Sequence, residues 1–187
     1  DNAITINLSH NDQLVCEQLD ALEATLGSDI ITAPAACITL TLIRDVHFID
    51  ANLEACVLAT ADRLGWTQLT EAEYFSCDDK DIEDLSGLQY FTSLTSLSLY
   101  HNKISDIAVL ANLTALRFLT IYQNEISDIS SLTHLSALEN LQMHNNQIND
   151  ISALTNLTSM RFLYLYNNQI SDISALANLT ALTNLWF

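Results

Sequence analysis

Positively charged residues are scarce in this sequence. Six Lys and Arg residues stand against 23 Asp and Glu residues, which gives a formal net charge of −17. Most of the excess lies before residue 94, where 17 acidic side chains accompany three basic ones. Such a chain repels a phosphate backbone, so we predict that nucleic acid is not a partner.

Glycine, proline and recognisable catalytic motifs are also rare. Three glycines and one proline leave little loop material for an active site, and no nucleophile elbow, phosphate-binding loop or zinc-binding helix motif occurs. The five histidines are scattered, and the acidic stretch "CDDKDIEDL" lacks the central glycine and distal glutamate of a calcium loop. We therefore predict no enzyme, no cofactor and no metal site. No apolar run approaches the length of a membrane span, so membrane insertion is not expected.

Apolar residues, by contrast, make up 49% of the chain and recur with a fixed period. From Leu94 onward the sequence repeats every 22 residues, as "LTSLSLYHNKISDIAVLANLTA" followed by "LRFLTIYQNEISDISSLTHLSA" shows. Units start at residues 72, 94, 116, 138, 160 and 182, the first of them degenerate and the last cut to "LTNLWF". The pattern L-x-x-L-x-L-x-x-N-x-I is typical of leucine-rich repeats. For residues 72–187 we predict an α/β fold, a right-handed solenoid with a curved parallel β-sheet on its concave face.

Residues 1–71 do not follow the repeat. "NDQLVCEQLDALEATLG" and "DANLEACVLATADRLG" each place apolar residues on one helical face and end at a glycine, and "CITLTLI" between them has the composition of a strand. The open end of a solenoid exposes its core and requires a cap. We predict that residues 1–71 form an α-rich N-terminal cap.

Two pairs of cysteines share one spacing. Cys16 and Cys37 are 21 positions apart, as are Cys56 and Cys77, and in each pair the first lies on a predicted helix and the second on a following strand. This matching geometry favours the disulfides Cys16–Cys37 and Cys56–Cys77 among three possible pairings. The alternatives are four buried free thiols or, less favoured without a C-x-x-C pair, a zinc site. Disulfides would place the protein outside the cytoplasm.

Two polar residues recur in every regular unit. An asparagine follows each predicted strand, where its side-chain amide can serve donors and acceptors of adjacent coils, and we predict a buried ladder of Asn102, Asn124, Asn146 and Asn168. A second row, Asp106, Asp128, Asp150 and Asp172, is predicted to cap the short turn that begins at each "DI". Identical recurrence indicates a scaffold role for both rows.

Large aromatic residues gather on the opposite side of the strands from the core. Side chains alternate along a strand, so positions 3, 5 and 7 of each unit point to the concave face. These positions vary among Ser, Thr, Asn, Gln, Phe and Tyr while the rest of the frame is fixed, and such variation is typical of a recognition surface. Cross-strand packing that stabilises the sheet is the other interpretation. The candidate ligand-binding residues are Tyr74, Tyr100, Phe118, Tyr122, Asn140, Gln142, His144, Phe162, Tyr164, Tyr166 and Trp186.

The unit "N-x-I-S-D-I-S-x-L-x-N-L-T" resembles the internalin-type leucine-rich repeat of bacterial surface and secreted proteins. The resemblance covers residues 72–187. It implies a fold of this type, an acidic helical cap, and a secreted, cell-surface or periplasmic location. The cap sequence of this chain, with its paired cysteines, is more elaborate than the usual internalin cap. The chain begins at Asp1 without a methionine, which is expected either of a processed protein whose leader has been removed or of a fragment of a longer protein.

Three functions compete on these observations. The first is a protein-recognition module for a host or envelope protein, with Arg117, Glu139 and Arg161 at the margin of the aromatic face. The second is a carbohydrate-binding solenoid that uses the same face, with aromatic rings stacked on sugars and amides bonding the hydroxyls. The third is a structural solenoid that self-associates through the apolar residues of its last unit.

Overall fold

The computed structural model describes residues 6–7, 31–32 and 42–187. The chain divides into two compact units, Asp1–Thr41 and Leu42–Phe187. In the first unit, strands β1 (Ile6–Asn7) and β2 (Ile31–Thr32) pair in parallel. The predicted first helix and the predicted pair Cys16–Cys37 lie outside the described residues. The second unit contains all of the repeats.

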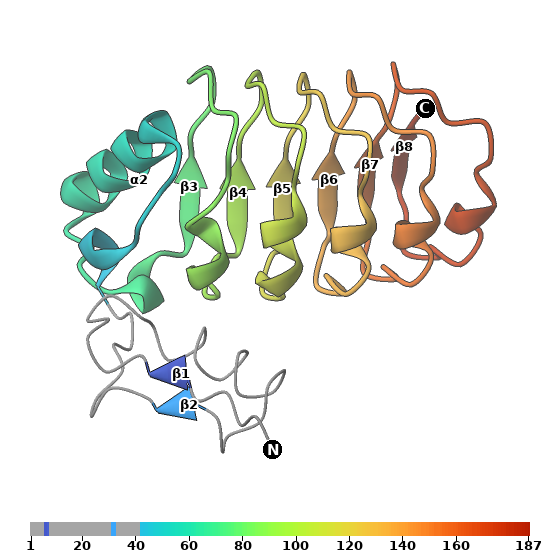
Figure 1. Cartoon of the computed structure of the whole chain (residues 1–187). Helices are drawn as coiled ribbons and strands as arrows, with labels where there is room; N and C mark the ends of the chain where they lie inside the picture. Colours follow the sequence, from blue (N-terminus) through green and yellow to red (C-terminus); the bar gives the residue numbers. More distant parts are fainter. Residues whose placement is uncertain (1–5, 8–30, 33–41) are drawn as a thin grey trace. The chain divides into compact units, whose positions relative to one another are not determined.

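The repeats form one parallel sheet whose strands lie in sequence order (Figure 1). Every strand pairs with the next at a shift of one 22-residue unit, so that Phe118 lies beside Asn140 and Asn140 beside Phe162. Residues at one repeat position therefore form a row across the sheet. This arrangement confirms the predicted leucine-rich repeat solenoid. The strands are β3 (Tyr74–Ser76), β4 (Ser96–Ser98), β5 (Phe118–Thr120), β6 (Asn140–Gln142), β7 (Phe162–Tyr164) and β8 (Asn184–Trp186).

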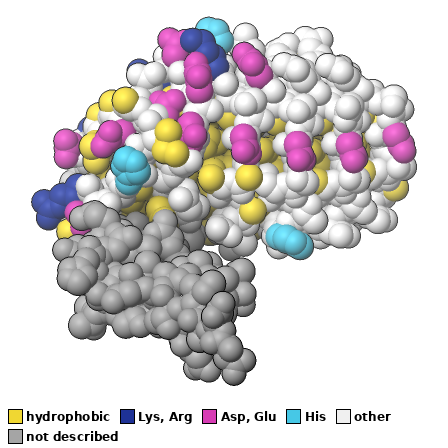
Figure 2. All heavy atoms as spheres, viewed as in Figure 1, with side chains coloured by type: hydrophobic (Ala, Val, Ile, Leu, Met, Phe, Trp, Pro, Cys, Tyr) yellow, Lys and Arg dark blue, Asp and Glu magenta, His cyan; other side chains and the backbone are white. Residues whose placement is uncertain are grey.

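Each strand returns to the next through a short 3-10 turn on the far side of its coil. The turns are η4 (Leu88–Tyr90), η5 (Ala108–Asn112), η6 (Ser130–Leu132), η7 (Ser152–Leu154) and η8 (Ser174–Leu176). The carboxylates of Asp106, Asp128, Asp150 and Asp172 each accept the backbone N–H two residues later at 2.8 Å. These bonds satisfy the first amide of each turn. Figure 2 shows acidic side chains in a line across neighbouring coils.

Stacking of coils, rather than any single coil, buries the core. The inward strand residues Leu119, Leu141 and Leu163 are completely buried between their neighbours. In the last unit of the chain the equivalent Leu185 is 43% exposed. The burial of a repeat position thus depends on a coil on each side, as expected for a solenoid whose units cannot stand alone.

The asparagines join successive coils from inside the solenoid. Asn124 accepts the Ile104 amide at 3.0 Å and donates to the carbonyls of Leu99 and Ile121 at 3.0 and 3.2 Å. Asn102, Asn146 and Asn168 repeat this geometry one coil away each time. Each asparagine side chain thus hydrogen-bonds to backbone N–H and C=O groups that would otherwise lack partners where the chain turns away from the strand.

A single α-helix precedes the repeats within the described residues. Helix α2 (Ala51–Leu64) begins at Asp50, whose side chain caps it, and ends at Gly65 in the left-handed conformation. Leu53 and Val57 are fully buried on its inner face. The sequence predicted a helix in this segment, with one apolar face and a glycine at its end. Between the helix and the repeats lies the turn η3 (Leu69–Glu71), closed by a capping box.

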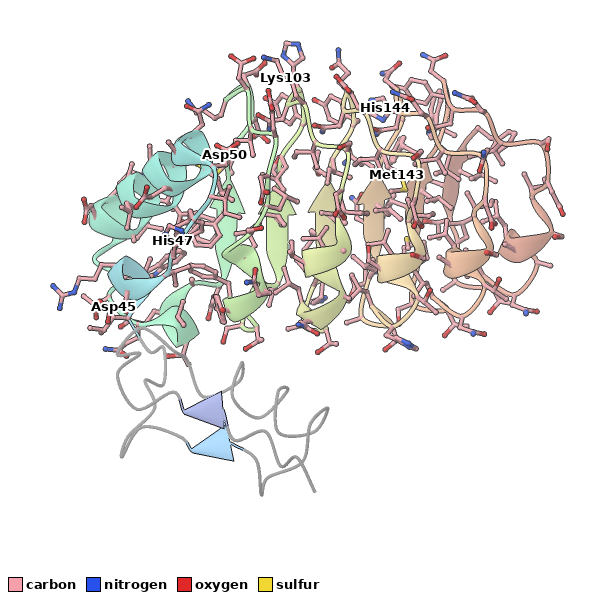
Figure 3. The ribbon with its side chains drawn as sticks, viewed as in Figure 1. Asp45, His47, Asp50, Lys103, Met143 and His144 are labelled. Carbon is pink, nitrogen blue, oxygen red and sulfur yellow. A yellow bond between two sulfur atoms is a disulfide. The ribbon has the colours of Figure 1, made fainter. Side chains whose placement is uncertain are left out.

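The contacts that attach α2 and its flanking residues to the first coil include a disulfide, a close ring contact and a set of hydrogen bonds. Cys56 on the helix forms a disulfide with Cys77, with the Cα atoms 5.8 Å apart. Phe48 packs against Gly87, where an added Cβ would lie 2.5 Å from the Phe48 ring. Gly87 also has a φ of 108°, so no other residue fits this turn without strain. Asp50, at the junction of helix and coil (Figure 3), supplies the hydrogen bonds.

The Asp50 carboxylate serves two backbone segments. One oxygen accepts the amides of Asn52 and Leu53, and the other accepts those of Glu83 and Asp84 at 2.8 and 3.3 Å. Burial alone would raise the pKa of Asp50, but these amide donors outweigh it and hold the pKa below its usual value. Because the folded-state pKa is the lower one, this contribution to stability is present above the unfolded value of about 4 and is lost as the pH falls through the lowered pKa.

Replacing Asp50 by alanine should therefore lower the free energy of unfolding by about 1–2 kcal/mol. Asp50→Asn keeps a helix-capping oxygen but turns an NH₂ group toward Glu83 and Asp84, so it should cost less than alanine and should flatten the loss of stability below about pH 4. Urea unfolding at a series of pH values measures both effects. Equal costs for the two variants would mean that the helix cap contributes nothing and that the contact with the first coil accounts for the whole loss.

Candidate functional site

The concave face, defined as positions 3, 5 and 7 of each repeat unit, brings together all eleven residues that the sequence singled out. The 22-residue register of the strands places them in three rows. The position-3 row contains Tyr74, Phe118, Asn140 and Phe162. The position-5 row contains Gln142, Tyr164 and Trp186. The position-7 row contains Tyr100, Tyr122, His144 and Tyr166.

The position-7 row is a continuous stack of rings. Centroids of successive rings from Tyr100 to Tyr166 lie 4.7, 4.3 and 4.2 Å apart, with interplanar angles of 3°, 12° and 17°. The spacing matches that of hydrogen-bonded strands, so the sheet itself sets the stack. The two interior members, Tyr122 and His144, have a ring on each face and therefore present only their edges. Burial, with a smaller contribution from neighbouring Tyr100 and acidic groups, raises the pKa of the Tyr122 hydroxyl.

His144 is the most enclosed residue of the row. It lies between Tyr122 and Tyr166, it is only 9% exposed, and its Nδ1 atom has no hydrogen-bond partner among the described residues. Desolvation lowers its pKa, which favours the neutral imidazole. Figure 3 places His144 beside Met143, the core residue that precedes it. The sequence identified His144 as a candidate contact, and the structure leaves it little surface with which to make one.

Asp78 begins the position-7 row in place of a ring. Its carboxylate accepts the hydroxyls of Ser76 and Ser98, each at 2.6 Å, and the Tyr100 amide at 3.1 Å. These three donors hold strands β3 and β4 together where the stack starts. The sequence placed Asp78 on this face without indicating that role.

The most accessible rings lie in the other two rows. Tyr74 and Phe118 are each 41% exposed and Trp186 is 58% exposed. Tyr164 stacks on Trp186 with centroids 6.4 Å apart, and Tyr74 meets Trp66 edge-on at 5.2 Å. Sequence reasoning missed Trp66 because it follows α2, outside the repeat frame, where no periodic pattern assigns it to a face.

Charged side chains form one margin of this face at position 2 of the units. Arg117 donates to one Glu139 oxygen from Nε and Nη2 at 2.9 and 2.7 Å. The guanidinium carbon of Arg117 also lies 5.5 Å from the Phe118 ring centroid, and that of Arg161 lies 6.0 Å from the ring of Phe162.

Comparison with known proteins supports the repeat assignment. The family model for two copies of a leucine-rich repeat matches residues 114–156. The structure of an internalin, InlF of Listeria monocytogenes, is 33% identical with a TM-score of 0.71, over 79% of this chain and 45% of its own. The chain carries internalin-type leucine-rich repeats. It spans less than half of the InlF chain that it matches.

Two further structures share the fold of these internalin-type repeats at lower identity. The functional domain of InlJ from Listeria monocytogenes is 23% identical with a TM-score of 0.61, over 76% of this chain and 33% of its own. A leucine-rich repeat protein of Leptospira interrogans is 23% identical with a TM-score of 0.53, over 57% of this chain and 28% of its own. A search of curated protein sequences gave no match.

Outside the concave face, the internalin-type coils carry shallow hollows. One of about 440 Å³ lies between neighbouring turns and is lined by small and polar residues that include Asp128, Ser130 and Asp150. Within residues 42–187 and the two short strands before them, no three His, Cys, Asp or Glu side chains converge as a metal site would require. Nor does any helix of this described part have the length and apolar character to cross a membrane.

Proposed function

We propose that this chain is a non-catalytic recognition module that binds a host or envelope protein through its concave face. The proposal rests on the exposure of large aromatic rings at the variable positions of an otherwise constant 22-residue repeat. Phe118 and Trp186 keep 41% and 58% of their surface accessible, whereas the core-facing residues of strands β3 to β7 are at most 1% exposed. Aromatic residues with few rotatable bonds dominate binding hot spots because they bury much area at little cost in entropy.

The ring stack favours a protein over a sugar as partner. Carbohydrate recognition by aromatic residues requires an open ring face, and the faces of Tyr122 and His144 are covered by their neighbours in the row. What the row presents is a line of ring edges with tyrosine hydroxyls. Such edges suit hydrogen bonds and van der Waals contact with the side chains and backbone of a protein.

A carbohydrate ligand is the second candidate, on one specific observation. Asn140 and Gln142 are half-buried between the aromatic strands β5 and β7, and they share only a long hydrogen bond of 3.4 Å. Their remaining amide groups are available to the hydroxyls of a sugar held beside Phe118. A glycan array tests this candidate directly.

Two further proposals concern location and assembly. The Cys56–Cys77 disulfide supports a secreted, cell-surface or periplasmic protein, because such bonds persist in oxidising compartments. Self-association through the exposed Leu185, Trp186 and Phe187 stays a prediction, which light scattering of the purified chain at several concentrations checks.

Exchanging residues between repeats gives a test that spares the scaffold. The triple variant Phe118→Ser, Phe162→Asn and Tyr164→Gln installs residues that other units of this chain already carry at the same positions. We expect capture of a specific host or envelope protein, quantified by mass spectrometry and confirmed with that purified protein, to fall at least tenfold, because the anchors of the interface are lost.

A matched change on the turn side provides the control. Ser131→Ala installs the residue that Ala153 provides one unit later, and it should leave both fold and capture unchanged. Partners retained by the triple variant as well as by wild type would refute binding through the concave face. Glycan binding that is lost in the triple variant, without any protein partner, would favour the second candidate.

A further inference from the structure

The margin of the concave face alternates in charge from coil to coil. Successive units open with Arg117–Phe118, Glu139–Asn140, Arg161–Phe162 and Thr183–Asn184. The parallel register places Glu139 between the two arginines, one strand from each. Phe118 and Phe162 consequently stand two strands apart, roughly 9–10 Å, on either side of Asn140.

The two arginines are not equivalent. Glu139 binds Arg117 through two N–H donors, and its own side chain is only 26% exposed. Arg161 is exposed and makes no ion pair with any residue that the structure describes. Its guanidinium instead lies over the Phe162 ring. A guanidinium above an aromatic ring keeps its outward N–H donors for a further acceptor.

Glu139, one strand from Arg161, is paired with Arg117, and the inner positions of the face carry little of the negative charge that dominates the chain. From Ser96 onward, positions 3, 5 and 7 of the units contain no Asp or Glu. Four of the six acidic residues after residue 94 are the aspartates whose carboxylates bond the turns on the far side of the coils. Interactions between exposed charges fade beyond about 8 Å at physiological salt, so an acidic group that reaches Arg161 experiences mainly its local surroundings.

We propose that Arg161, Phe162 and Tyr164 form a subsite for an acidic side chain of the protein partner, with an apolar side chain next to it in the partner's sequence. The carboxylate binds the Arg161 guanidinium, the apolar side chain packs on the two rings, and the free amide groups of Asn140 and Gln142 bond the partner's backbone. A single guanidinium beside apolar rings suits one carboxylate, whereas a sulfated or phosphorylated chain requires a cluster of cations. This assignment rests on the proposed protein recognition by the concave face.

Peptides displayed on phage supply the probe. A library of random sequences is selected on the immobilised chain at physiological salt, and enriched peptides are synthesised for affinity measurement. We expect them to carry Asp or Glu beside an apolar residue and to bind Arg161→Gln about tenfold more weakly, the effect of one charge-assisted hydrogen-bonded pair. Glu139→Gln should strengthen their binding several-fold, because it frees the Arg117 guanidinium to bind a carboxylate or carbonyl oxygen of the peptide.

Arg63→Gln is the matched control, because it makes the same change of net charge on helix α2. It should leave peptide affinity within about twofold of wild type, since its charge is remote from the subsite. Enriched peptides without acidic residues, or equal affinity for wild type and Arg161→Gln, would overturn the subsite. In that case peptides that still lose binding to the Phe118, Phe162 and Tyr164 triple variant leave the proposed function standing. Peptides insensitive to both sets of changes overturn the two together.

Discussion

Asn124→Ala is expected to lower the free energy of unfolding by about 2–3 kcal/mol. The Ile104 amide has the Asn124 oxygen as its hydrogen-bond acceptor, and the bond is buried. The carbonyls of Leu99 and Ile121 each keep a second donor, because they also accept from a neighbouring ladder residue, Asn102 or Asn146. The variant therefore leaves one buried donor without a partner, weakens two acceptors, and opens a small void.

Asn168→Ala is the matched comparison, because Asn168 makes the same bonds in a half-buried position. Water can replace its oxygen at the Ile148 amide, so the loss should be about 1 kcal/mol. Urea unfolding gives the two costs, and hydrogen exchange of the Ile104 amide should speed up in Asn124→Ala alone. Equal costs at the two positions would show that burial does not determine the energy of the ladder.

The period of the sequence was sufficient to predict the sheet and its rows. Leu119, Leu141 and Leu163 recur every 22 residues, so a common frame placed them in the core and placed Phe118 and Phe162 on the opposite face. Helix α2 was equally readable, because Asp50 and Gly65 mark its ends with residues suited to those conformations. In both cases the sequence pattern agrees with the observed structure.

Other features depend on neighbours that no local pattern reveals. His144 occupies the same position as Tyr122 and Tyr166, yet it is nearly buried because those rings cover both of its faces. Likewise, Arg117 and Arg161 have the same local sequence context, Arg-Phe-Leu. Glu139 could pair with either, and only the side-chain geometry reveals that it binds Arg117. Side-chain exposure and ion pairing on the concave face therefore depend on the neighbouring side chains in the same row, and the local sequence alone does not reveal them.

The double variant Cys56→Ala, Cys77→Ala is expected to lose about 3 kcal/mol, the largest effect predicted for this chain. The bond closes a segment with a sequence separation of 21, and in the chain-entropy account its removal restores that much freedom to the unfolded state. Cys77 is also completely buried, so alanine leaves a small void in the first coil. Helix α2 and its flanking residues would then be held to the coil by the hydrogen bonds of Asp50, by Phe48 against Gly87, and by the packing of Leu53, Val57 and Trp66.

The loss should be concentrated at the helix, which the two tryptophans make measurable. In a Trp186→Phe background, fluorescence reports on Trp66, whose ring contacts Tyr74 and Phe75 where α2 ends and β3 begins. Without the disulfide, we expect the Trp66 transition in urea to precede the far-UV circular dichroism transition of the repeats, because neighbouring units of a solenoid unfold with limited cooperativity.

The double variant Cys16→Ala, Cys37→Ala is the control for the Cys56, Cys77 variant. It removes a cysteine pair that has the same spacing but lies outside the described residues. It should leave the order of the two transitions unchanged, whatever it does to residues 1–41. Coincident transitions with an unaltered midpoint in the Cys56, Cys77 variant would show that packing alone attaches the helix. A first coil that unfolds with α2 would instead show that the disulfide protects the core face of Phe75, which is 1% exposed and packs against Trp66.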